Sequence, residues 1–125
     1  MTRDQHPMFQ VVARGIEDDI VVGALDGGDQ IPSWHELSRQ YSISPSTASS
    51  TTTSLARKGL LERRRGVGLF VSPTAREQLL RERSASFEND YLKPMLTEAH
   101  RLRLSLDVVV ALIADRNPQV TRISS

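Results

Sequence analysis

The chain of 125 residues contains no cysteine. This absence excludes a disulfide scaffold, a thiolate metal site and a thiol nucleophile. The sequence also has no apolar run near the roughly 20 residues needed to span a bilayer. Its N-terminal residues, Met-Thr-Arg-Asp-Gln-His, lack the apolar stretch of a secretory signal. We therefore expect a cytoplasmic protein with no membrane partner.

Residues that could serve catalysis are few and unsuitably spaced. The three histidines, His6, His35 and His100, are far apart in the sequence, and none has a companion at metal-ligand spacing. Gly66 and Gly68 are not followed by a helix, as a phosphate-binding glycine loop requires. The sequence therefore predicts neither an enzyme nor a metal or cofactor site.

Two helices separated by a tight turn are predicted in the middle of the chain. Ser33 and Glu36 form the pattern of a capping box, in which a hydroxyl and a carboxylate satisfy two free backbone N–H groups. Ser44 precedes Pro45, and proline suits the first position of a helix because its missing N–H would have no partner there. Gly59 should end the second helix. The pattern is that of a helix-turn-helix.

A glycine-tipped hairpin should follow. Its arms are Leu61-Glu62-Arg63-Arg64 and Leu69-Phe70-Val71, joined by Arg65-Gly66-Val67-Gly68. Two of the three consecutive arginines must face solvent whichever face of the strand is buried. We expect this hairpin to be the cationic wing of a winged helix-turn-helix, with Ile31-Pro32 adding a short extended piece that pairs with it.

The core of this domain can be predicted from apolar spacing. A first helix over residues 7–22 should present one apolar face, made of Phe9, Val12, Ile16 and Ile20. That face should pack behind the helix-turn-helix, whose own core residues are expected to be Leu37, Ile43, Ala48, Leu55 and Leu60.

The order and spacing of short motifs over residues 7–71 resemble a known family. The motifs are Pro7-Met8-Phe9, Gly23-Ala24-Leu25, Ile31-Pro32-Ser33, Glu36-Leu37, Ile43-Ser44, Thr47, Gly59-Leu60-Leu61 and Gly66-x-Gly68-x-Phe70-Val71. In this order they are similar to the DNA-binding domain of the GntR family of bacterial transcription regulators. The resemblance implies a sequence-specific DNA-binding regulator, and a repressor in particular.

The short C-terminal part resembles the YtrA branch of that family, in which two helices mediate dimerisation. Pro45 also fits this branch. The resemblance implies a homodimer that binds an inverted-repeat operator in double-stranded DNA. Two departures from the family pattern are His35, where an arginine is usual, and Arg103, where a glycine often joins the last two helices.

The predicted DNA-contacting segment is basic and rich in hydroxyls. Residues 33–72 carry six basic and two acidic residues, a net charge of +4, whereas residues 1–32 carry two basic and six acidic residues, a net charge of −4. Small hydroxyls dominate residues 44–54, which favours backbone positioning over strong base discrimination. The residues expected to contact DNA are His35, Ser44, Pro45, Ser46, Thr47, Ser49, Arg63, Arg64, Arg65 and Gly66.

Residues 73–115 should form a helical dimerisation region. Thr74 and Glu77 repeat the capping-box pattern, Pro94 should bend or divide the long helix, and Ser105 should cap the last one. The run Val108–Val110 would also suit a strand. The expected dimer-interface residues are Phe87, Tyr91, Leu92, Met95, Leu96, Ala99, Leu106, Val109, Val110 and Ile113.

Alternatives remain open at this point. The apolar stripe could instead cover the winged domain of the same chain. The winged helix could serve protein contact rather than DNA, with Trp34 as an aromatic anchor. A small-molecule effector would find room only at a dimer seam. The predicted fold is mainly α with a small β-wing, divided into a DNA-binding domain (1–72), a dimerisation region (73–115) and a flexible tail (116–125).

Overall fold

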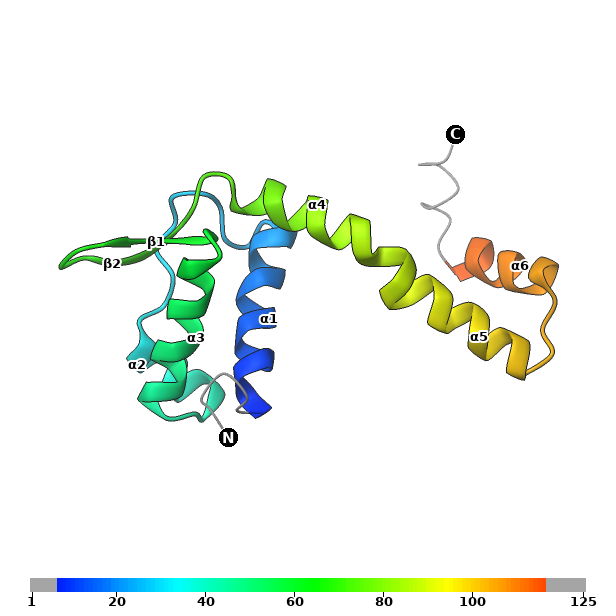
Figure 1. The fold of residues 1–125 in the computed structure, drawn as a ribbon, viewed down its shortest axis with the longest axis horizontal. Helices are drawn as coiled ribbons and strands as arrows, with labels where there is room; N and C mark the ends of the chain where they lie inside the picture. Colours follow the sequence, from blue (N-terminus) through cyan, green and yellow to red (C-terminus); the bar gives the residue numbers. More distant parts are fainter. Residues whose placement is uncertain (1–6, 117–125) are drawn as a thin grey trace. The chain divides into compact units, whose positions relative to one another are not determined.

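A computed structural model describes residues 7–116, and the predicted flexible tail lies, apart from Arg116, outside these residues. The chain divides into two compact units, the first ending at Arg83 and the second beginning at Ser84. The described elements are α1 (Pro7–Val22), α2 (Trp34–Tyr41), α3 (Pro45–Arg57), β1 (Leu61–Arg64), β2 (Gly68–Val71), α4 (Ala75–Phe87), the π-helix η2 (Glu88–Leu92), α5 (Lys93–Arg101) and α6 (Leu106–Arg116) (Figure 1).

The first unit is the predicted winged helix-turn-helix. Helices α1 and α3 lie side by side, and α2 packs against α3 (Figure 1). Both apolar faces expected from the sequence are buried: Phe9, Val12, Ile16 and Ile20 of α1, and Leu37, Ile43, Ala48, Leu55 and Leu60 of the following segment. Burial of each large aliphatic side chain contributes about 1.5–3 kcal/mol. This shared core fixes α3 relative to the rest of the unit.

The predicted wing is a two-stranded antiparallel sheet. Leu61 pairs with Val71 and Arg64 with Gly68, so the tip lies at Gly66, which has a left-handed φ of 76°. The expected extended piece pairs with β2 through an isolated bridge between Gln30 and Phe70. The wing is therefore connected to the segment before α2 through its second strand, β2.

The start of α4 belongs to the first unit because two arginines attach it to α1. Arg76 donates to the carbonyl oxygens of Ile20 (2.8 Å) and Leu25 (3.2 Å), which satisfies backbone acceptors at and beyond the end of α1. Arg83 donates to Asp18 (2.7 Å) and Glu17 (3.3 Å). Burial opposes the charged form of Arg83, but these hydrogen bonds outweigh it and raise the pKa of the guanidinium above its usual value.

The capping box expected at the start of α4 does not form in the described residues. The hydroxyl of Ser72 accepts from the N–H of Thr74 (3.4 Å), and Glu77 pairs instead with Arg81 on the next turn (3.7 Å). Thr74 directly precedes α4 and its carbonyl oxygen accepts from the N–H of Gln78 (3.0 Å), but its side chain does not form the expected reciprocal cap with Glu77.

The second unit is helical throughout its regular elements, so the strand alternative for Val108–Val110 is wrong. Pro94 lies in the first turn of α5, directly after the π-turn η2, which confirms it as a helix boundary. Ser105 caps α6, accepting from the N–H of Val108 at 3.2 Å. Arg103 takes the left-handed φ of 58° that a glycine would adopt at this joint. No described helix is long and apolar enough to cross a bilayer.

Candidate nucleic-acid interface

Helix α2 begins with the predicted capping box. The Ser33 hydroxyl accepts from the N–H of Glu36 (3.2 Å), and the Glu36 carboxylate accepts from the N–H of Ser33 (3.1 Å). The hydrogen bonds from the Ser33 backbone and hydroxyl lower the pKa of Glu36. The box fixes the first turn of α2, where Trp34 and His35 are exposed with their rings stacked at a centroid distance of 3.9 Å.

The N-cap of helix α3 is Ser44, whose hydroxyl accepts from the N–H of Thr47 at 3.1 Å. Thr47 itself is only 4% exposed, and its hydroxyl is 2.9 Å from that of Ser44. Its side chain therefore contributes to the helix start rather than to the exposed face. Thr51 and Thr52 are also buried, and their hydroxyls donate to carbonyl oxygens one turn back, those of Thr47 (2.8 Å) and Ser49 (3.0 Å).

The hydroxyl-rich helix is therefore divided between two faces. The buried face carries the three threonines together with Ala48 and Leu55. Of the five residues in α3 and its N-cap that are expected to contact DNA, Ser44, Pro45, Ser46 and Ser49 are exposed. These exposed side chains are small, so the phosphates and base edges of a duplex could approach the helix backbone closely.

The three wing arginines are all exposed, but they occupy different positions. Successive residues of a strand point to opposite faces, so Arg63 and Arg64 diverge. The guanidinium carbon of Arg64 lies 3.9 Å from the centroid of the Phe70 ring, a cation–π contact. Arg65 follows in the turn beside Gly66. Arg63 instead lines a pocket of about 200 Å³.

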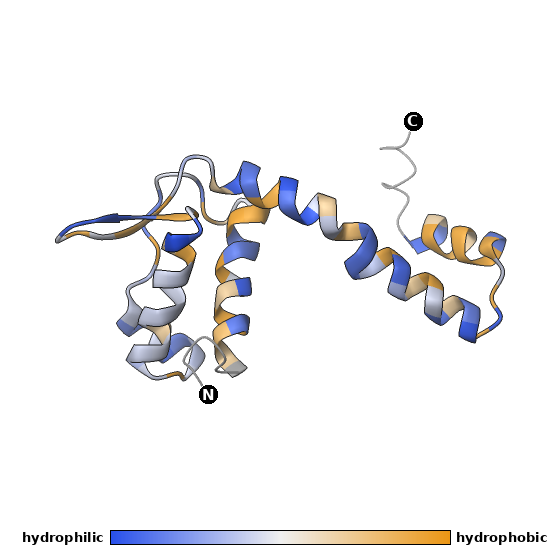
Figure 2. Cartoon of the chain, viewed as in Figure 1, coloured by the Kyte–Doolittle hydropathy of each residue, from blue (hydrophilic) through white to orange (hydrophobic). Residues whose placement is uncertain are grey.

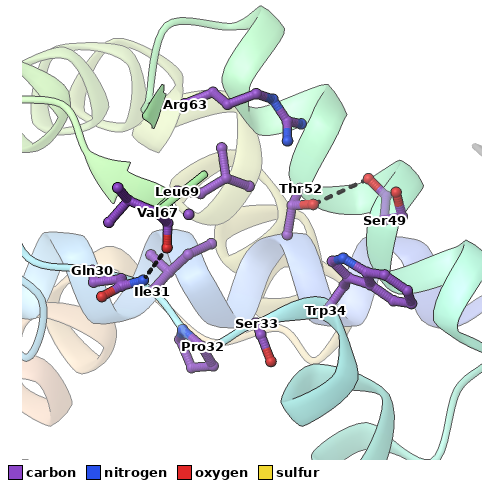
Figure 3. Close-up of a pocket in the computed structure, with 11 residues that line it drawn as sticks. Gln30, Ile31, Pro32, Ser33, Trp34, Ser49, Thr52, Arg63, Val67 and Leu69 are labelled. Atoms are coloured by element: carbon purple, nitrogen blue, oxygen red, sulfur yellow. Dashed lines mark hydrogen bonds between the residues drawn. The ribbon is translucent and has the colours of Figure 1, made fainter. Parts of the chain in front are cut away.

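That pocket lies between the wing, α2, α3 and the segment that precedes α2 (Figure 3). It is lined by Gln30, Ile31, Pro32, Ser33, Trp34, Ser49, Thr52, Arg63, Val67, Gly68 and Leu69. One edge is fixed by Gln30, whose side-chain amide donates to the carbonyl oxygen of Val67 at 2.9 Å. The pocket thus brings together two predicted DNA-contact residues, Ser49 and Arg63, whereas His35 is not part of its lining.

The basic side chains of residues 33–72 are not occupied by salt bridges with described acids. Within residues 7–116, none of the six forms a salt bridge with a described acid; they are Arg39, Arg57, Lys58, Arg63, Arg64 and Arg65. The described salt bridges all lie outside this segment. The described residues also contain no cluster of acidic residues and histidines that could hold a metal ion.

Residues 9–71 match the family described as bacterial regulatory proteins, gntR family. The chain belongs to the GntR family. This GntR chain is 27% identical to the HTH-type transcriptional repressor YtrA of Bacillus subtilis over 105 residues, covering 84% of this chain and 80% of that protein. It is 34% identical to the probable fructoselysine utilization operon transcriptional repressor of Escherichia coli over 73 residues, covering 58% of this chain but only 30% of that protein.

Solved structures of other proteins share the fold. A GntR family transcriptional regulator from Listeria monocytogenes has a TM-score of 0.71 at 20% identity, covering 90% of this chain and 96% of that one. The AraR DNA-binding domain in complex with operator ORR3 has a TM-score of 0.51 at 30% identity, covering 53% of this chain and 80% of that one. The predicted family, winged-helix fold and non-enzymatic class are thus confirmed, and the winged domain is the DNA-binding domain of a GntR regulator.

The residues expected at a dimer interface lie on α4, η2, α5 and α6 of this GntR chain. Ala99 and Val109 are buried, Leu92 is partly buried, and the remaining residues are exposed, namely Phe87, Tyr91, Met95, Leu96, Leu106, Val110 and Ile113. Figure 2 shows most of α6 in the hydrophobic colours. An almost entirely apolar groove of about 300 Å³ lies between α5 and α6, lined by Met95, Glu98, Ala99, Leu102, Leu104, Val109, Leu112 and Ile113.

Reasoning from the sequence missed two features of the candidate DNA-contacting face. The prediction that Thr47 contacts DNA rests on its residue type alone. Thr47, Thr51 and Leu55 follow one another at intervals of four residues, which is typical of the buried face of a helix. Trp34 entered the sequence analysis only as an aromatic anchor in the alternative of protein contact, yet it lines the same pocket as Ser49 and Arg63. No local sequence pattern relates Trp34 to the wing, because the two meet only in the folded domain.

Proposed function

We propose that this chain is a transcriptional repressor that binds an inverted-repeat operator as a homodimer. The observation that carries the proposal is the wing, where three exposed arginines form no salt bridge with a described acid. The name of the YtrA relative, a transcriptional repressor matched over most of its length, supports repression. The AraR domain, solved in complex with an operator, supports duplex DNA as the partner.

The proposed contacts use two parts of the winged domain. The exposed face of α3, with Ser44, Pro45, Ser46 and Ser49, approaches the major groove or its phosphates. The wing arginines and Gly66 contact the neighbouring backbone or the minor groove, where arginine is favoured by the negative potential. His35, exposed at the start of α2, adds a phosphate contact. Thr47 supports these contacts indirectly, through the start of α3.

The second unit supplies the proposed dimer interface. Its exposed apolar side chains and the groove between α5 and α6 form a surface that a second copy would remove from water. A two-fold dimer presents two identical winged domains, and two such domains require half-sites related by the same symmetry. Any small-molecule effector would act at this seam, since the apolar groove lies there.

A titration of labelled duplex DNA at several salt concentrations tests the DNA-binding role. Changing Arg63, Arg64 and Arg65 together to alanine should weaken binding to all sequences and flatten the salt slope by roughly 0.9 for each phosphate that the wing no longer neutralises. The matched control is a triple alanine variant of Arg81, Arg101 and Arg116, three exposed arginines outside residues 33–72. A salt slope that falls equally in both triple variants contradicts the wing assignment.

Sedimentation of two valine variants tests the dimer. Val110 in α6 is 55% exposed and Val11 in α1 is 50% exposed, so the two differ in location but little in exposure. Val110→Asp should convert the dimer to a monomer, because a carboxylate would be buried without a partner, whereas Val11→Asp should remain a dimer. A wild-type chain that sediments as a monomer at all concentrations contradicts the proposal.

A further inference from the structure

Trp34 is the single tryptophan of the chain and is 43% exposed, although an indole is among the side chains that gain most from burial. It is the first residue of α2, and its ring stacks on that of His35 at an interplanar angle of 27°. Figure 3 shows the indole beside Ser49 of α3, with the side chain of Arg63 also directed toward α3. A large aromatic ring is therefore exposed to solvent on the proposed DNA-binding face.

The pocket beside Trp34 is too small for an ordinary effector. Its volume is about 200 Å³, whereas pockets for small-molecule ligands usually have about 300–1,000 Å³. Its walls combine the cation of Arg63, the hydroxyl of Ser49 and the apolar face of Trp34. One phosphate with its sugar carries the complementary chemistry, because the phosphate is an anion and hydrogen-bond acceptor and the deoxyribose presents C–H groups.

The position of the pocket indicates how such a group would reach it. If α3 lies in a major groove and the wing reaches the adjacent minor groove, the DNA strand that separates the two grooves must pass between α3 and the wing. The pocket occupies this gap, since Ser49 and Thr52 of α3 form one wall, and Arg63 and Leu69 of the wing form another.

We propose that the pocket receives one deoxyribose-phosphate unit of the bound duplex, with Arg63 on the phosphate and the Trp34 ring against the sugar. This inference rests on the DNA-binding function proposed above and extends it to a residue that is neutral. Because Trp34 carries no charge, its contact releases no counterion. It should therefore raise affinity for DNA without changing the salt dependence of binding.

The first measurement needs no variant. Because Trp34 is the only tryptophan, its emission reports on this pocket alone. Mixed-sequence duplex DNA, labelled at one end, is titrated with the protein at low salt, and probe anisotropy and tryptophan emission are followed together. Both signals should change with the same midpoint. Binding seen by anisotropy with unchanged emission overturns the inference and leaves the DNA-binding function intact.

The second measurement compares variants by anisotropy across a salt series. Trp34→Ala should weaken binding by roughly five- to thirtyfold, the usual range for an aromatic interface residue, with the wild-type salt slope. Trp34→Phe should recover part of the affinity, and its circular dichroism melt shows whether the fold is kept. Val22→Ala, which trims another exposed apolar side chain of the same unit, should bind as wild type.

The outcomes separate the two proposals. Wild-type affinity in a folded Trp34→Ala variant overturns the inference alone and directs attention to a protein partner for this ring. A reduced salt slope in that variant also overturns it, because the weakened binding would then come from charged groups. Absence of any salt-sensitive DNA binding by the wild-type chain overturns both this inference and the DNA-binding function.

Discussion

The three consecutive wing arginines should contribute unequally to DNA binding. Arg64 lies over the ring of Phe70, a side chain only 8% exposed, and so helps to cover the base of the wing. Arg63 points to the other face of the strand and lines the pocket beside α3. The alternation of side chains along the strand therefore gives the three arginines different roles. We expect Arg64 to stabilise the wing, and Arg63 and Arg65 to bind phosphates.

Single alanine variants give this division a magnitude. Arg63→Ala and Arg65→Ala should each reduce the salt slope of DNA binding by about 0.9, which is about a threefold smaller affinity change over a fourfold change in salt. Arg64→Ala should change the slope by less than half of that. It should instead lower the stability of the winged domain by about 0.5–1 kcal/mol, the usual strength of an exposed cation–π contact. That reduction corresponds to a decrease of roughly 2–8 °C in the Tm of a domain of this size.

Two assays carried out on the same preparations separate the effects. Anisotropy of labelled duplex at four salt concentrations gives the slope, and thermal unfolding followed by circular dichroism gives the stability. Arg64→Gln serves as a control that keeps side-chain bulk but removes the charge. The reasoning is refuted if Arg64→Ala lowers the slope as much as Arg63→Ala and leaves the Tm unchanged.

Three further predictions concern stability. Gly59→Ala should cost about 1–2 kcal/mol in urea unfolding, because φ at this position is +82° and an L-residue is strained there; an unchanged midpoint would contradict the C-terminal cap of α3. In a double-mutant cycle, Arg83 and Glu17 should show a coupling free energy of about 1 kcal/mol, a value that is reduced because solvent reaches their ion pair. If the effects of the two single mutations on stability are strictly additive, the pair does not hold α4 against α1. The pKa of Glu36 lies below its ordinary value of 4.5, so the carboxylate stabilises the fold at a pH above 4.5. This stabilisation is lost as the pH falls below that value. Glu36→Gln should be less sensitive to acid over that range, and identical acid unfolding curves would refute the capping box.

Local signals predicted the fold well. The capping box at Ser33, the proline at the start of α3 and the glycine after it are each determined by a few adjacent residues, and the structure confirms all three. The amphipathic spacing of residues 7–22 likewise gave the bounds of α1. These features need only the hydrogen-bonding and conformational preferences of nearby residues, and therefore a single sequence suffices.

Features that depend on distant residues were not predictable in this way. The ion pair of Arg83 with Glu17 and the bonds from Arg76 to the end of α1 join segments more than fifty positions apart. No periodicity marks either arginine as an anchor. The location of Trp34 beside the wing has the same origin, because it follows from how α2 packs on α3.

The hydrogen bonds of Arg76 and Arg83 explain part of the uneven charge distribution, in which acids are concentrated in residues 1–32 and basic residues in residues 33–72. Three of the acids in residues 1–32, Glu17, Asp18 and Asp26, accept hydrogen bonds from Arg76 or Arg83 of α4. These acids are therefore occupied in holding α4 against α1. The cations of residues 33–72, by contrast, form no salt bridge with a described acid. Because an internal ion pair would have to be broken before a cation could bind phosphate, this arrangement favours the proposed contact between the wing cations and DNA.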